Sequence, residues 1–309
     1  MDSRQLRYFA AIHEEGSLAR AADRERVAVS ALSRHLANLE AELGVPLFER
    51  LPRGVRPTAS GARLYEHARA ILKSMQAASA DIRDTETEIA GEISVGFAHS
   101  VVKAIGVQLM QRVSRDYPNL RLHLSEIFSG ATARQLASAE VDLTITYNQP
   151  PDSRFRFQPI LEEEVVLLGH PDRVGGTGPI PFDAVLEMPL IILRQGLNAR
   201  AVMDDPSLLR RIEERAQFQM NSITAIDGSL LSGIGCLIGT EFILSDHLTA
   251  GRLISRPIIK PALSRILYVG ELNDRPPTFA FETIRQLCID LTVEAVANKR
   301  WKAELLTGR

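Results

Sequence analysis

The residues with the clearest chemical use lie within the first sixty positions of the 309-residue chain. Small hydroxyl side chains and an arginine share one face of a predicted helix, where they let the backbone approach base edges and fork onto a guanine or a phosphate. Three further arginines surround Gly54 in a turn that suits the phosphate backbone or a narrow groove. This pattern predicts double-stranded DNA as a partner, and an ordinary surface charge cluster is the alternative. The predicted contact residues are Val29, Ser30, Ser33, Arg34, Arg50, Arg53 and Arg56.

The elements that must position this face follow in a fixed order. A capping-box pattern at Asp2 and Gln5 begins the first helix. Ser17 is placed to cap a second, short helix, and a third helix with leucines every three or four residues ends at Gly44. Together with the basic turn, they predict a winged helix-turn-helix over residues 1–58.

A dense set of short motifs runs through these helices and the turn: Leu6-Arg7-Tyr8-Phe9, Gly16-Ser17-Leu18, Arg20-Ala21-Ala22, Ala31-Leu32-Ser33-Arg34, Leu39-Glu40, Leu43-Gly44, Leu47-Phe48-Glu49-Arg50 and Thr58-Ala59-Ser60-Gly61. Together they resemble the LysR-type transcriptional regulators, and the likeness continues more weakly through nearly the whole chain. The resemblance implies a sequence-specific DNA-binding transcriptional regulator, with RNA polymerase as a further candidate partner. One departure concerns the target sequence. This family often has a serine and a glutamine where this chain has Ala28 and Val29, so an amide that could read adenine is missing.

A long helix is predicted after the wing. Thr58 can cap it, and a narrow apolar stripe follows at alternating four- and three-residue intervals, which is typical of a helix that pairs with another helix. Packing against its own domain is the alternative. The resemblance favours pairing and implies a homo-oligomer, either a dimer or a dimer of dimers. Residues 59–90 are therefore predicted to form a linker and dimerisation helix followed by a hinge. The predicted seam residues are Leu64, Ala68, Ile71, Met75 and Ala78.

Beyond the hinge, the apolar pattern alternates between strand and helix, which predicts an α/β fold. We expect an effector-binding domain over residues 91–309, with lobe I at about 91–161 and 267–309 and lobe II at about 162–266. The resemblance implies that this two-lobed unit is similar to the type 2 periplasmic-binding proteins. The elements predicted here include a helix over 101–117 and strands at 93–97, 120–128, 141–147, 165–168, 190–193, 218–220, 236–238 and 266–270.

The loops after the predicted strands are polar and should line a cleft between the lobes. Helix N-termini that face a cleft offer backbone N–H groups to a carboxylate or another small anion. Plain N-capping is the alternative for the hydroxyl residues. An arginine in one of these loops could supply the counter-charge, although it could equally pair with a carboxylate or lie in solvent. The predicted effector contacts are Ser100, Thr132, Asn148, Arg194 and Ser222.

The distribution of charge agrees with a DNA-binding N-terminal part and a separate effector-binding part. Residues 1–80 hold 12 Lys and Arg against 9 Asp and Glu, whereas the rest of the chain has an acidic excess. Cys236 and Cys288 fit neither a disulfide framework nor a metal site, and no apolar run reaches the length of a membrane span. The N-terminal helix does not resemble a signal sequence, so the cytoplasm is the expected location.

The sequence contains no recognisable catalytic motif. Gly175-Gly176-Thr177-Gly178 lacks the lysine and hydroxyl of a P-loop, and neither H-E-x-x-H nor G-x-S-x-G occurs. The prediction is therefore a regulator that is not an enzyme and needs no metal or other cofactor. A small-molecule effector, anionic if the cleft prediction holds, would alter promoter binding or bending. A solute-binding module and an enzyme with an attached DNA-binding domain are the alternatives.

Overall fold

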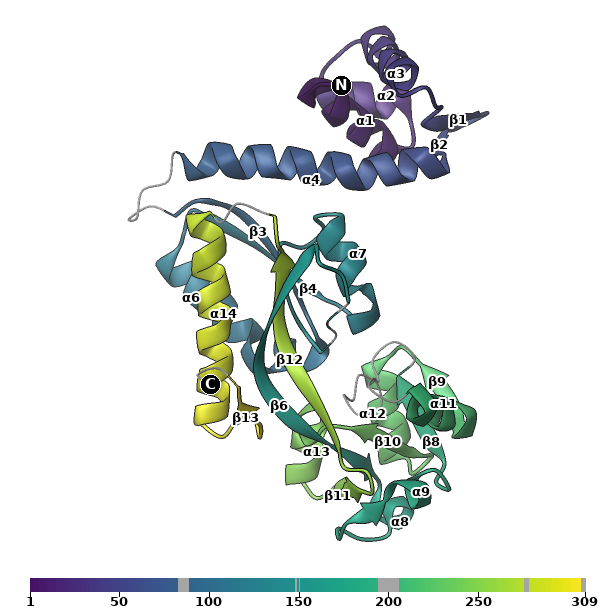
Figure 1. Cartoon of the computed structure of the whole chain (residues 1–309), viewed down its shortest axis with the longest axis vertical. Coiled ribbons are helices and arrows are strands. Elements are labelled where there is room, and N and C mark those ends of the chain that lie inside the picture. Colours follow the sequence, from purple (N-terminus) through teal and green to yellow (C-terminus); the bar gives the residue numbers. More distant parts are fainter. Residues whose placement is uncertain (83–88, 148, 150, 194–205, 275–277, 307–309) are drawn as a thin grey trace.

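The computed structural model describes residues 1–82, 89–147, 149, 151–193, 206–274 and 278–306. Its described part divides into an N-terminal helical domain, one long helix and a two-lobed α/β domain (Figure 1). None of the helices in that part is both long enough and apolar enough to cross a membrane.

The N-terminal domain is a winged helix-turn-helix. It contains α1 (Ser3–Glu15), α2 (Leu18–Glu25), α3 (Val29–Leu43) and a hairpin of β1 (Phe48–Leu51) and β2 (Gly54–Pro57). The predicted capping box is confirmed, because Asp2 accepts from the backbone of Gln5 and the Gln5 side chain accepts from the backbone of Asp2. A small apolar core that includes Phe9, Ile12 and Leu39 holds the three helices together.

The long helix α4 (Ala59–Asp81) starts against this core. Thr58 caps it by accepting from the backbone N–H of Gly61 at 3.0 Å. A Cβ atom at Gly61 would lie 2.1 Å from the carbonyl oxygen of Leu47, so only glycine allows the helix to approach the residue before β1 this closely. The remainder of α4 lies across one end of lobe I (Figure 1).

Lobe I is a mostly parallel sheet covered by helices. Its strands β3 (Gly91–Phe97), β4 (Leu120–Glu126) and β5 (Leu143–Thr146) run parallel in the order β4-β3-β5. The predicted helix over 101–117 is present but is divided into three segments, with a π-helical turn at its centre. The covering segments are α5 (His99–Val101), η1 (Val102–Gly106), α6 (Val107–Asp116), η2 (Ser129–Ala131), α7 (Thr132–Ala137) and α14 (Phe279–Ala297).

Lobe II continues the same sheet. Its strands β8 (Leu190–Leu193), β9 (Ala216–Met220) and β10 (Cys236–Gly239) run parallel in the order β10-β8-β9. The remaining elements are α8 (Pro171–Val174), β7 (Ile180–Pro181), α9 (Phe182–Val185), α11 (Pro206–Arg215), α12 (Ile223–Leu231), η3 (Glu241–Leu244), α13 (Ser245–Thr249) and β11 (Ile254–Ile259).

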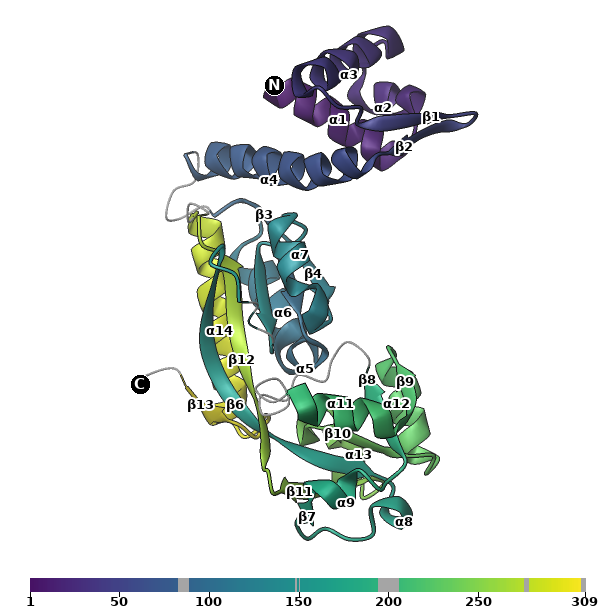
Figure 2. The same cartoon turned by 45° about the vertical axis from the view of Figure 1, so that its right-hand side comes forward.

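Two long antiparallel strands join the lobes, and both are longer than the sequence indicates. Strand β6 (Phe155–Gly169) was predicted only at 165–168, and β12 (Leu263–Leu272) only at 266–270. The middle of β6 is not predicted from the sequence, because its consecutive carboxylates Glu162-Glu163-Glu164 do not form the apolar pattern of a strand. The structure accommodates them by pairing β6 with β12 and with the short β13 (Glu304–Leu305) (Figure 2).

Candidate DNA-binding surface and effector pocket

Helix α3 presents the predicted face away from the domain core. Leu32 and Leu39 point inward and are fully buried, which leaves Ser30 and Arg34 exposed and Ser33 half-buried on the other side. Val29, at the first turn, keeps 47% of its surface exposed. The residue before it, Ala28, makes no side-chain cap. The start of α3 therefore offers backbone N–H groups, small side chains and one cation to a ligand.

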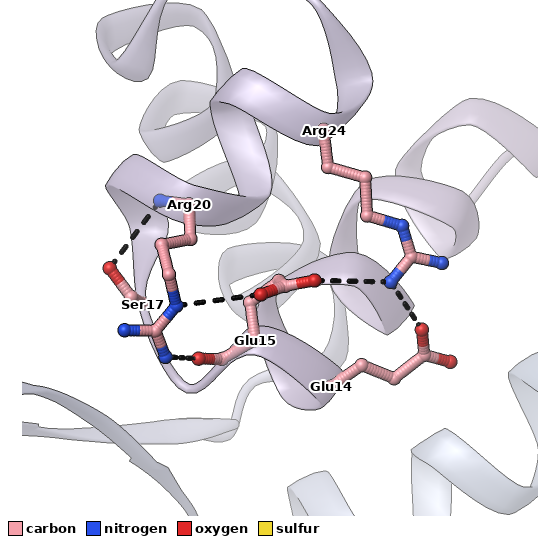
Figure 3. A network of polar contacts seen from close by, with 5 residues as sticks. All are labelled: Glu14, Glu15, Ser17, Arg20 and Arg24. Atoms are coloured by element: carbon pink, nitrogen blue, oxygen red, sulfur yellow. Dashed lines mark hydrogen bonds and ion pairs between the residues drawn. The ribbon is translucent and has the colours of Figure 1, made fainter.

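A polar network fixes the helix that precedes α3. Arg20 donates to the carboxylate and the backbone carbonyl of Glu15, and Arg24 donates to Glu14 at 2.6 Å (Figure 3). Ser17 accepts from the backbone N–H of Arg20, as predicted for the cap of α2. Burial opposes ionisation of Glu14, but hydrogen bonds from Tyr65 and Arg24 outweigh it and lower the pKa of this carboxyl. These arginines hold α2 in place and are already neutralised.

The arginines of the wing differ from one another. Arg50 and Arg53 are exposed on the hairpin, whereas Arg56 donates to the Glu49 carboxylate at 2.6 Å. Within the described residues no ion pair joins Arg34, Arg50 or Arg53 to an acidic group. Their charges are free to replace the counterions of a nucleic-acid backbone.

The two halves of the predicted seam of α4 have different environments. Ala68 is completely buried and Leu64 partly buried against the core of the N-terminal domain. Because Ala68 has no exposed surface, the prediction that it meets a partner helix is corrected: it packs within its own domain. Ile71 and Met75 keep 40% and 49% of their surface exposed, and Ala78 is also exposed. The second half of the stripe is thus the part available to a partner.

A pocket of about 70 Å³ lies between the two lobes of the effector domain. It sits at the carboxyl ends of the parallel strands, where the α/β pattern predicts ligand loops. Apolar side chains from both lobes form most of its wall, and His99 and Glu126 add a pair joined at 3.1 Å. The main lining residues are Ile127, Phe128, Leu193, Ile226, Leu237, Leu244 and Arg265.

The structure brings only part of the predicted effector set to this pocket. Ser100 lines it, but its hydroxyl is 2.6 Å from that of Tyr147, so it is not a free cap. Thr132 is fully buried and does not line the pocket, and it is not the cap of α7, since Ala131 occupies that position. Ser222 caps α12 by accepting from Ala225, and the neighbouring Ile223 lines the pocket instead.

The expectation of three converging caps is therefore wrong, since of Ser100, Thr132 and Ser222 only Ser222 acts as a side-chain cap. The other two predicted contacts, Asn148 and Arg194, lie outside the described residues.

A buried charge pair lies beside the pocket, with its arginine in the lining, and sequence reasoning missed it. Arg265 of β12 donates to Glu163 of β6 at 2.7 Å and to the Thr240 hydroxyl at 2.9 Å. Its guanidinium lies 3.6 Å from the centre of the Tyr147 ring, and Trp301 donates its indole N–H to Glu163 at 2.9 Å. Burial opposes the charge on Arg265, but the Glu163 carboxylate outweighs it and raises the arginine pKa. Burial raises the pKa of Tyr147 well above its usual value, so this hydroxyl stays protonated.

A lysine bridges the lobes beside the pocket. Lys103 of lobe I donates to the carbonyl oxygens of Phe242 and Ile243 at 3.3 and 3.2 Å, and to Ser245 at 3.0 Å, all in lobe II. Such a contact can form only while the lobes keep this separation. The pocket therefore has walls on two bodies and a polar tie across them.

The cysteines are buried and contribute no site. Burial raises the pKa of Cys236 to about 11 and also raises that of Cys288, so both stay as unreactive thiols at neutral pH. The described part of the chain contains no group of His, Cys, Asp or Glu side chains that could hold a metal ion.

A winged helix-turn-helix with free cations, joined through one helix to a two-lobed domain with a pocket between its lobes, defines a class: DNA-binding regulators that carry their own effector-binding domain. Family comparisons agree with this class. The bacterial regulatory helix-turn-helix of the lysR family matches residues 3–62, and the LysR substrate binding domain matches residues 86–292. The chain belongs to the LysR family of DNA-binding transcriptional regulators.

Known proteins are similar along most of the chain. The nitrogen assimilation regulatory protein nac of Klebsiella aerogenes is 32% identical over 242 residues, which cover 78% of this chain and 79% of that protein. The same protein of Escherichia coli is 31% identical with the same coverage of each chain.

Solved structures share the fold. A full-length OxyR variant from Pseudomonas aeruginosa superposes with a TM-score of 0.71 at 22% identity and covers 94% of both chains. LysG from Corynebacterium glutamicum, solved with its bound effector Arg, gives a TM-score of 0.63 at 16% identity and covers 95% of this chain and 99% of that one.

Proposed function

We propose that this regulator binds promoter DNA through α3 and the wing, and that a small molecule bound between its lobes changes the way it holds that DNA. The observation that carries the DNA half is the set of exposed arginines at positions 34, 50 and 53, none of which has an acidic partner among the described residues. The effector half is supported by the apolar pocket with walls on both lobes. A ligand that binds one lobe separation better than another shifts the population of that separation.

The described lining also bears on the effector's chemistry. Arg265 is neutralised by Glu163, and Glu126 adds a carboxylate at the His99 pair. The described wall thus favours a compact, largely apolar molecule over a small dianion, since an unpaired charge is costly to bury there. The anionic effector expected from the sequence would need a cation outside the described residues.

The experiment starts from selection of bound sequences from a random double-stranded library with the purified full chain. Gel shifts on the selected operator then measure affinity against salt concentration. A metabolite panel screened by thermal shift supplies ligands, and each is tested for its effect on affinity, footprint and bend angle. The effector half is wrong if ligands that bind with measurable heat leave all three quantities unchanged.

We infer that the exposed half of the α4 stripe pairs two protomers, so that two copies of α3 can meet successive major-groove faces about 34 Å apart. Two substitutions, Ile71→Glu and Met75→Glu, should lower the mass seen in analytical ultracentrifugation. Gln76→Glu is the control for each single substitution, because it adds the same single charge at an exposed position about 100° around the helix from Met75. An unchanged mass in the double variant would move the interface elsewhere.

Function by binding alone, without catalysis, is also our proposal, and RNA polymerase is the candidate protein partner at the promoter. Relatives that match the chain are named as a nitrogen assimilation regulatory protein and a probable transcriptional activator. Incubation of each ligand with the protein, followed by mass spectrometry, tests the enzyme alternative. Any chemically altered ligand would overturn the proposal.

A further inference from the structure

Lobe I holds a lysine of the linker helix in a polar socket. The ammonium of Lys73, in the middle of α4, lies 2.7 Å from a carboxylate oxygen of Asp142. It also donates to the Ser94 hydroxyl and to the backbone carbonyl of Ala139, each at 3.3 Å. The Asp142 side chain has no exposed surface, and that of Lys73 keeps only 20%. This contact ties the linker helix to the effector domain within one chain.

The backbone of lobe I builds this socket. Asp142 accepts from the backbone N–H of Ser94 at 2.8 Å, and the Ser94 carbonyl accepts from the backbone N–H of Asp142 at 2.7 Å. Ala139 adopts a left-handed conformation with φ of 52°, which is uncommon for a residue other than glycine. A buried carboxylate that loses its counter-charge is strongly destabilised. Lobe I therefore favours conformations in which Lys73 occupies the socket.

The socket and the effector pocket lie at opposite ends of the segment over which β3 and β5 pair. Ser94 belongs to β3 and Asp142 immediately precedes β5, and these strands are adjacent and parallel, with Val95 opposite Leu143. At their carboxyl ends, β3 leads to Ser100 and β5 to Tyr147, which line the pocket and share a hydrogen bond. The five residue steps from Asp142 to Tyr147 span about 17 Å of extended chain.

We propose that this socket couples the pocket to the DNA-binding domain, with β3 and β5 as the connecting element. A ligand that displaces Tyr147 or Ser100 moves the carboxyl ends of two buried, mutually hydrogen-bonded strands. Because packed strands move as a unit, Ser94 within β3 and Asp142 before β5 shift too and change the hold on Lys73. The helix that carries Lys73 starts against the core of the winged domain. Release of Lys73 from the socket therefore changes the placement of α3. This inference rests on the proposed effector pocket.

Lysine reactivity tests the proposal without ligand or DNA. The chain has five lysines, at positions 73, 103, 260, 299 and 302, so acetylation of each can be followed by peptide mass spectrometry. In the full-length protein we expect Lys73 to react at least tenfold more slowly than the exposed Lys299. Asp142→Asn should bring the two rates within about twofold of each other, since the ammonium then loses the charge of its carboxylate partner. Ser94→Ala keeps the carboxylate and should raise the Lys73 rate about twofold, which provides a second variant if Asp142→Asn does not fold.

The coupling is tested from the other end of the strands. Tyr147→Phe and Ser100→Ala each remove the hydrogen bond between the two carboxyl ends, and each should raise the Lys73 rate about threefold while Lys260 and Lys299 stay unchanged. Asp116→Asn, on the exposed end of α6 in the same lobe, is the control and should change none of the rates. The proposal is overturned if Lys73 reacts as fast as Lys299 in the unmodified chain, or if both pocket variants leave the Lys73 rate unchanged. A failure of DNA binding or of effector binding in gel shifts would contradict the proposed function alone, because this measurement uses neither.

Discussion

The arginines of the DNA-facing surface and the arginine of the effector pocket have opposite environments. Arg34, Arg50 and Arg53 are exposed and have no ion pair in the described part of the chain. Arg265 is buried, paired with Glu163 and stacked on Tyr147. A surface that binds a polyanion gains from cations that exchange counterions for phosphates, whereas a buried cation is tolerable only with a partner. One residue type thus serves recognition in one region and architecture in the other.

Breaking the buried pair should have the largest effect. Arg265→Met leaves the buried Glu163 carboxylate without its cation, and we expect it to lower the free energy of unfolding by about 3–5 kcal/mol. Urea denaturation of the full chain, followed by Trp301 fluorescence, measures this change. Adding Glu163→Gln should recover part of the loss, since no unpaired charge then remains. Arg154→Met, at the exposed pair with Asp152, is the matched control and should change stability little. If the single variant is as stable as that control, the pair does not support the pocket.

Removal of the recognition-helix cation should come next. Arg34→Ala is expected to cost about 1–3 kcal/mol of DNA-binding free energy and to relax the base preference at one position of the operator, because a bidentate arginine distinguishes guanine from the other bases. Gel shifts on the selected operator and on single-base variants measure both effects. A uniform loss on all sequences would instead mean that Arg34 contacts a phosphate.

The wing should give a smaller, sequence-independent effect. We expect Arg53→Ala to weaken binding uniformly and to reduce the slope of log affinity against log salt by about 1. Arg56→Ala provides the internal comparison, because Arg56 already pairs with Glu49 and has less charge to offer. Equal effects of the two variants would show that the hairpin rearranges on DNA. Unchanged affinity in Arg53→Ala would count against the wing assignment.

The smallest effect concerns pH and the support of the DNA-binding surface. Burial lowers the pKa of His13, whose ring stacks on that of Tyr65 with 3.8 Å between centroids. Because the folded pKa lies below the unfolded value of 6.5, the unfolded chain binds the proton more readily. The stability that comes from the neutral His13 ring is therefore fully present above pH 6.5 and declines as the pH falls through the unfolded pKa and then the folded pKa.

Melting curves at pH 8 and pH 5.5 measure this decline. We expect the acid-induced fall in Tm to be smaller in His13→Phe than in the unmodified chain. The difference should reach about 4 °C at most, which is the shift that about 1 kcal/mol produces in a small domain. An identical fall in the variant would exclude His13 as a source of the pH dependence.

The winged domain and the effector pocket also differ in how much of their structure the sequence predicts. In the winged domain, the cap at Asp2, the break at Gly16 and the leucine stripe of α3 are local signals, and the structure contains each of them. In the effector domain, the sequence predicts that the hydroxyls at positions 100, 132 and 222 lie at helix N-termini facing a cleft, and of these only Ser222 acts as a cap. A hydroxyl beside a helix start does not reveal whether it faces a cleft, a tyrosine or the core.

By itself, the sequence determined the winged helix-turn-helix, the alternation of strands and helices behind it, and the family, because caps, periodicity and short motifs act over a few residues. The tertiary structure decided which charges meet. Glu163 and Arg265 are 102 positions apart, and Lys73 meets Asp142 across two domains. No local pattern marks such pairs, because a pairing between distant positions depends on strand register and on the placement of α4 against lobe I. Unpaired arginines on the DNA-facing surface and a neutralised one in the effector pocket are therefore a property of the fold, within the described residues.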